Sequence, residues 1–90
     1  MIDLAIQVLL ACLGGAVVAV AVNAAIDAYT IRKKVKEQFI EAAKVIINET
    51  DIRSVTVGIY DHSDRQIKEM KLSSEKGIAS DLKQGQVIYL

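Results

Sequence analysis

The sequence predicts an α+β membrane protein, in which one long N-terminal transmembrane helix continues into an amphipathic helix and then into a small antiparallel β domain of about three strands. Three observations predict this fold: an uncharged apolar stretch over residues 4–26, apolar residues at helical spacing after it, and alternating apolar residues beyond position 50. The predicted units are a transmembrane anchor helix (1–30), a basic amphipathic connecting helix (31–48) and a small cytoplasmic β-rich domain (49–90).

The apolar stretch has the length of a membrane span. Residues 4–26 contain no Asp, Glu, Lys or Arg. As a helix they would extend about 34 Å, slightly more than the roughly 30 Å hydrocarbon core of a bilayer. A cleaved signal peptide fits less well, because only Asp3 and the α-amino group carry charge before the stretch, which also exceeds the usual apolar core of about 7 to 15 residues. The stretch therefore predicts an uncleaved single-pass anchor.

Four cations follow the apolar stretch within five positions: Arg32, Lys33, Lys34 and Lys36. Because positively charged flanks stay on the cytoplasmic side, they predict an integral membrane protein with a cytoplasmic C-terminus, and the internal membrane of a virion is an alternative location. The same cations could hold anionic lipid headgroups. The lipid bilayer is the expected partner. Eleven acidic and eleven basic residues give a formal net charge of zero, so no overall field attracts nucleic acid, which is not expected as a partner.

Small residues recur every four positions along the predicted anchor. Ala11, Gly15 and Ala19 form one series, and Ala24 with Ala28 repeats the spacing. In a membrane helix such a stripe lets a second backbone approach closely, which stabilises association where no hydrophobic force acts between helices. The stripe predicts helix packing in a homo-oligomer or a larger membrane complex. The alternative is chance, because alanine and glycine are common in membrane helices.

The connecting helix is predicted from a second apolar series. Ile31, Val35, Phe39, Ala42 and Ile46 follow one another at steps of three or four, which places them on one stripe of a helix. The stripe has three uses that the sequence leaves open. It covers the C-terminal domain, pairs with a copy of itself, or lies on the membrane surface.

The last part of the chain has the pattern of a small sheet. Residues 51–60 alternate in the manner of a strand, 61–64 have turn chemistry, and 66–72 read as a second, partly charged strand. A short helical turn is expected over 78–83, and a terminal strand over 86–90. About 42 residues is close to the limit below which a chain rarely folds without support, so this domain is expected to need a partner or another part of the chain.

No catalytic or cofactor site is predicted. Asp61, His62, Ser63 and Asp64 include the residue types of a hydrolytic triad, but triad members normally meet from separate elements of the fold, so a turn is the preferred interpretation. A metal site on His62 would lack a second histidine or cysteine ligand. Cys12 is the only cysteine, which excludes an intramolecular disulfide. We therefore expect no enzyme, no cofactor and no bound metal.

Three functions remain open at this point. The leading hypothesis is a non-enzymatic structural or accessory membrane protein that self-associates through its transmembrane helix and docks a partner with its C-terminal domain. The second is a small phage or virion membrane protein, holin-like or involved in delivering nucleic acid across the membrane, although its helix has few polar groups to line a pore. The third is a membrane tether that binds a cytoplasmic ligand through the four cations at positions 32–36.

Overall fold

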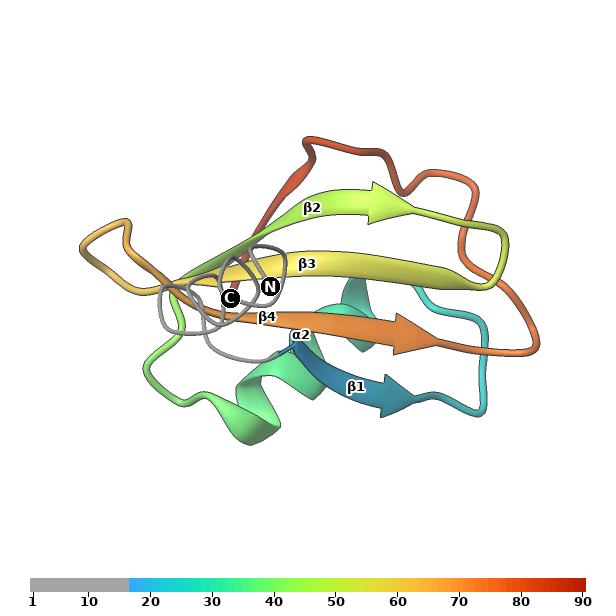
Figure 1. Ribbon diagram of the computed structural model, residues 1–90, viewed down its shortest axis with the longest axis horizontal. Coiled ribbons are helices and arrows are strands. Elements are labelled where there is room, and N and C mark those ends of the chain that lie inside the picture. The colour runs from blue at the N-terminus through green and yellow to red at the C-terminus, as the bar shows by residue number, and fades with distance from the viewer. Residues whose placement is uncertain (1–16) are drawn as a thin grey trace, which may run out of the picture.

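Five strands and one helix follow one another along the chain in the computed structural model, which describes residues 17–90 (Figure 1). The strands lie side by side in one sheet in the order β1-β4-β3-β2-β5. In chain order the elements are β1 (Val17–Ala21), α2 (Ala28–Gln38), β2 (Lys44–Thr50), β3 (Ser54–Tyr60), β4 (Gln66–Ser73) and β5 (Val87–Tyr89).

The sheet is mixed, because its first strand pairs in parallel and the others pair in antiparallel fashion. β1 runs parallel to β4, whereas β3 lies antiparallel between β2 and β4, and β5 pairs antiparallel with β2. β1 and β2 therefore point in the same direction with two strands between them. A connection between strands of the same direction has to return along the sheet, and α2 provides that crossover.

The helix packs on one face of the sheet, behind the strands in the view of Figure 1. Alternation along β3 shows which face it covers, since Val55, Val57 and Ile59 are buried toward the helix. Side chains from every element join them in one apolar core, which stabilises the fold by removing this surface from water. Its buried members are Ile26, Ile31, Val35, Ala42, Val45, Ile47, Val55, Val57, Ile59, Met70, Leu72, Leu82 and Ile88.

The predicted long transmembrane helix is wrong. Within residues 17–90 no helix is long and apolar enough to cross a bilayer, and the second part of the apolar stretch is strand β1 followed by a loop. Val17, Val18 and Val20 are β-branched and favour an extended backbone, which here pairs with β4. The single-pass description and the integral-membrane localisation, with a cytoplasmic C-terminus or in a virion membrane, are contradicted together with it. Residues 1–16 of the predicted anchor lie outside the described residues.

The connecting helix is shorter than predicted, and the sheet is larger. α2 ends at Gln38, and Lys44–Thr50 is strand β2, paired with β3 on one side and β5 on the other. The run Val45-Ile46-Ile47 consists of β-branched residues, so burial between two strands outweighs their helical spacing from Ile31 and Val35. Over residues 17–90 the fold is thus a five-stranded mixed sheet with one short helix, instead of two joined helices followed by about three strands.

The hairpin predicted over residues 51–72 is present as β3 and β4, joined by the turn at 61–65. The short helical turn expected over 78–83 is instead a bridge between Ile78 and Ile26 followed by a turn. The terminal strand is β5, which is shorter than predicted. The sheet therefore takes residues from all three predicted units.

Candidate functional site

The strongest charged feature of residues 17–90 is the helix α2, whose ends are fixed by local hydrogen bonds. Asp27 precedes the helix, and its Oδ1 accepts the backbone N–H of Thr30 at 2.8 Å. This backbone hydrogen bond holds the pKa of Asp27 below its usual value. At the other end the N–H of Phe39 donates to the carbonyl of Val35 at 2.8 Å. The helix is therefore about 16 Å long and held in a defined position.

Opposite faces of α2 have opposite character. Ile31 and Val35 are fully buried against the sheet. The outward side carries one aromatic ring and three cations at spacings of three, four and seven residues, which places them on one stripe. We call this stripe the basic face of α2, and it consists of Tyr29, Arg32, Lys33 and Lys36. The ring of Tyr29 is 66% exposed.

Few acidic groups offset the charge of this face. Lys34 is half-buried beside the stripe, and its Nζ lies 3.9 Å from a carboxylate oxygen of Glu37. Among the described residues, no carboxylate forms an ion pair with Arg32, Lys33 or Lys36. Arg32 donates from Nε to the carbonyl oxygen of Tyr89 at 3.2 Å, which fixes its side chain without neutralising it. Three cations therefore remain available to an external anion.

The four cations singled out in the sequence are thus brought together on one helix, three of them on its exposed face. Their suggested role in membrane topology depended on a spanning helix, which residues 17–90 do not contain. Their suggested contact with anionic headgroups stays a prediction. Tyr29 was not among the predicted site residues, although its position three residues before Arg32 was a usable signal. The sequence holds no signal for the contact between Arg32 and Tyr89, because 57 residues separate them.

The small residues predicted to pack helices lie in different elements. Ala19 is on β1, Ala24 is in the loop after it, and Ala28 begins α2. These three alanines therefore do not share one helical stripe. The carbonyl of Ala24 has a different contact, since it accepts a hydrogen bond from the buried Ser74 hydroxyl. The other two members, Ala11 and Gly15, lie outside the described residues.

The acidic segment at 61–64 is organised as a turn. Asp61 Oδ1 accepts the backbone N–H groups of Ser63 at 2.8 Å and Arg65 at 3.0 Å, and the bond from Arg65 is the main cause of a lowered pKa for Asp61. Asp64 has a positive φ of 63° and lies 2.7 Å from Lys44 Nζ, which raises the pKa of that lysine. Because the Asp61 carboxylate is directed at the backbone, it does not orient an imidazole as a triad aspartate does.

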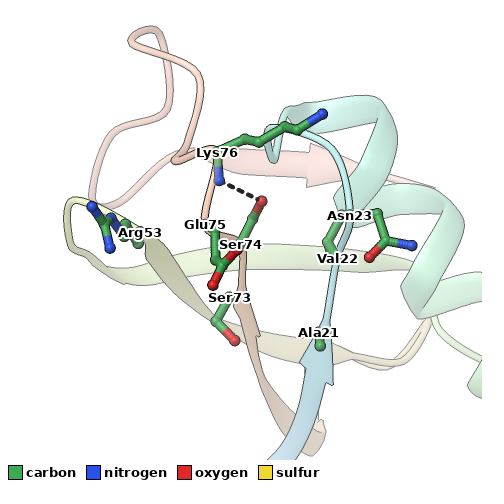
Figure 2. A pocket seen from close by; sticks show the side chains of 8 residues that line it. All are labelled: Ala21, Val22, Asn23, Arg53, Ser73, Ser74, Glu75 and Lys76. Atoms are coloured by element: carbon green, nitrogen blue, oxygen red, sulfur yellow. Dashed lines mark hydrogen bonds between the residues drawn. The ribbon is translucent and has the colours of Figure 1, made fainter.

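No cluster suited to a metal ion occurs among residues 17–90, taking three or more His, Cys, Asp or Glu side chains as the criterion. A concavity of about 480 Å³ lies where β1 and β4 end, with Asn23 on one side and Arg53 on the other (Figure 2). At its base the hydroxyl of Ser74 donates to the Ala24 carbonyl at 2.8 Å and accepts the N–H of Lys76 at 3.1 Å. These bonds give Ser74 a structural role, joining the loop after β1 to the loop after β4.

The chain matches no protein-family model, no curated protein and no solved structure. Fold and site together define a class: a small mixed-sheet domain with one crossover helix that presents a basic, tyrosine-containing face.

Proposed function

We propose that this protein is a non-enzymatic docking module that binds the surface of an anionic bilayer through the basic face of α2. One observation carries the proposal: Arg32, Lys33 and Lys36 share the exposed side of one helix and have no acidic partner among the described residues. Lipid phosphates and carboxylates supply the complementary charge. The interaction is peripheral, because the apolar residues Ile31 and Val35 are buried in the core and cannot enter the lipid.

A bilayer surface suits this site better than nucleic acid does. Nucleic-acid-binding domains are typically strongly basic overall, whereas this chain has a net charge of zero and a sequence pI of about 6.6. Anionic membrane surfaces attract small basic clusters on otherwise neutral proteins at short range, with a Debye length of about 8 Å at physiological salt. Tyr29 supports the same assignment, because tyrosine has an apolar ring and a polar hydroxyl and is enriched at membrane interfaces.

The expected strength follows from the number of cations. Each lysine or arginine near an anionic membrane contributes about 1 kcal/mol, so three contribute about 3 kcal/mol, or roughly a hundredfold in the partition constant. Such binding is weak and reversible. It should decrease steeply as salt is raised, because both the surface potential and the side chains are exposed to solvent.

The test is co-sedimentation of the full chain with vesicles of phosphatidylcholine alone or mixed with phosphatidylserine. The variant replaces Arg32, Lys33 and Lys36 by glutamine, and circular dichroism verifies its fold. A matched control replaces three other exposed lysines by glutamine and so has the same net charge: Lys71, Lys76 and Lys83. We expect wild type to prefer the mixed vesicles and the basic-face variant to lose roughly a hundredfold in binding.

Three results would contradict the proposal. The first is equal binding of wild type to both kinds of vesicle. The second is an equal loss in the control variant, which would show that only net charge matters. The third is binding to a single-stranded oligonucleotide without binding to mixed vesicles, which would assign the basic face to nucleic acid instead.

A further inference from the structure

The two edges of the sheet are built differently. β5 is only three residues long, and its outward carbonyl at Tyr89 accepts the Nε donor of Arg32 at 3.2 Å. β1 has neither device. Its sequence Val-Val-Ala-Val-Ala contains no charge and no proline, which are the features that usually protect an edge strand from pairing. Within residues 17–90, β1 is therefore the edge that is open to another strand.

The hydrogen-bonding direction of β1 can be assigned from the bond at its end. The N–H of Val22 donates inward to the carbonyl of Ser73 on β4 at 2.8 Å. Because backbone groups alternate along a strand, Val18 and Val20 also point their N–H and C=O groups at β4. The backbone groups of Ala19 and Ala21 point away from the sheet, ready to pair with a further strand.

We propose that this further strand is β1 of a second copy, paired antiparallel about a twofold axis at Ala19. Ala19 then faces the partner's Ala19, and Val17 faces the partner's Ala21. These are the residues whose backbone N–H and C=O groups point outward, so the facing residues can exchange backbone hydrogen bonds. The two sheets become one continuous sheet of ten strands.

Side-chain chemistry favours a second copy as the occupant. The paired side chains are only valine and alanine, so no like charges meet when the strand faces itself. On the helix side, half-buried Val18 would lie beside the partner's Val20, extending both cores. On the other side, Val17 is 50% exposed and would be covered. A twofold contact also closes on itself, so one interface protects the β1 edge of both copies.

The symmetry has a consequence for docking, which rests on the proposed function. A twofold axis between antiparallel strands stands perpendicular to the sheet, so both α2 helices lie on the same face of the ten-stranded sheet. The two basic faces then point to the same side and can contact one flat surface together. Two weak sites that bind together raise the apparent affinity well above that of one.

Disulfide trapping tests the pairing directly, without lipid. In the full chain with Cys12→Ser, the substitution Ala19→Cys places two thiols across the twofold axis. Cα atoms of a hydrogen-bonded antiparallel pair are about 5.5 Å apart, within the range of disulfides. Lys83→Cys in the same background is the control, because Lys83 is exposed and far from β1 in sequence. We expect mild oxidation to link the Ala19→Cys protein at least tenfold faster than the control.

Sedimentation equilibrium supplies the second readout. Ala19→Pro removes an outward N–H and should give a folded monomer, whereas Ala19→Thr keeps that N–H and should remain a dimer like wild type. Equal crosslinking of the two cysteine proteins, or a monomeric wild type at high micromolar concentration, would overturn the proposal. If Ala19→Pro does not fold, the crosslinking comparison decides. A dimer that fails to bind mixed vesicles would refute the proposed function and leave the pairing intact.

Discussion

Substitution of Ser74 by alanine tests the hydrogen bonds that join the loop after β1 to the loop after β4. The Ser74 side chain is 5% exposed, and its hydroxyl bonds the carbonyl of Ala24 and the N–H of Lys76. Alanine leaves both backbone groups without these partners at a part-buried site. An unsatisfied buried group costs about 1–3 kcal/mol, so we expect a loss of about 2 kcal/mol in the free energy of unfolding. For a domain of this size, that lowers Tm by about 8–16 °C.

The control for this prediction is the neighbouring residue. Ser73→Ala removes a serine hydroxyl from an exposed position at the end of β4, so it should change the free energy of unfolding by less than about 0.5 kcal/mol. Urea unfolding followed by circular dichroism measures both variants. Equal stabilities of the two variants would refute the reasoning, because Ser74 bonds Ala24 only if the residues after β1 leave the strand as a loop.

Other predictions concern turns and the helix end. Asp27→Ala should destabilise the domain by about 1 kcal/mol in urea unfolding by removing the N-cap of α2. The Thr30 N–H lowers the pKa of Asp27, so the stabilisation from its charge is present above the unfolded pKa of 3.8 and is lost as pH falls through the folded pKa. The difference in free energy of unfolding between wild type and Asp27→Ala should therefore shrink in acid. A difference independent of pH would argue against the charged cap. Gly85→Ala should lower the free energy of unfolding by about 1 kcal/mol, because the φ of Gly85 is +88°. Gly77→Ala should lower it more, because the φ of Gly77 is +86° and a Cβ there would also lie 3.3 Å from the Ile52 carbonyl oxygen. A higher Tm for Gly77→Ala than for Gly85→Ala would contradict this.

The hairpin of β3 and β4 could be predicted from the sequence because its signals are local. Val55, Val57 and Ile59 alternate with polar residues, and one face of this strand is covered by the core while the other is not. Asp61 then supplies the side-chain oxygen that a turn requires. Local rules were sufficient here because each strand pairs with its neighbour in sequence.

β1 could not be identified in the same way. It is apolar on both faces, with Val18 and Val20 toward the helix and Val17 and Ala19 on the other side, so it shows no alternation. A short apolar run of this kind fits a helix as well as a strand, and its continuity with earlier apolar residues favoured the helix. The deciding contact is with β4, about 50 residues further along the chain.

The site was partly visible in the sequence. The cluster of cations at 32–36 could be recognised in the sequence, because charge density is a local property. The orientation of this cluster could not be predicted from the sequence. Ile31 and Val35 decide which cations are exposed by packing against a sheet whose strands come from distant positions in the chain. Phe39 and Ile46 matched the helical spacing of these two residues by coincidence, although the chain turns between them and enters β2.

Both proposals depend on residues 17–50 folding as strand, short helix and strand. The most direct test is the pattern of ¹³Cα and ¹³Cβ NMR chemical shifts along the full chain. Our account predicts strand-type shifts for Val17–Ala21 and Lys44–Thr50 and, within residues 17–90, helical shifts only for Ala28–Gln38. Continuous helical shifts from residue 17 to 48 would contradict it, and would remove both the open β1 edge and the position of the basic face.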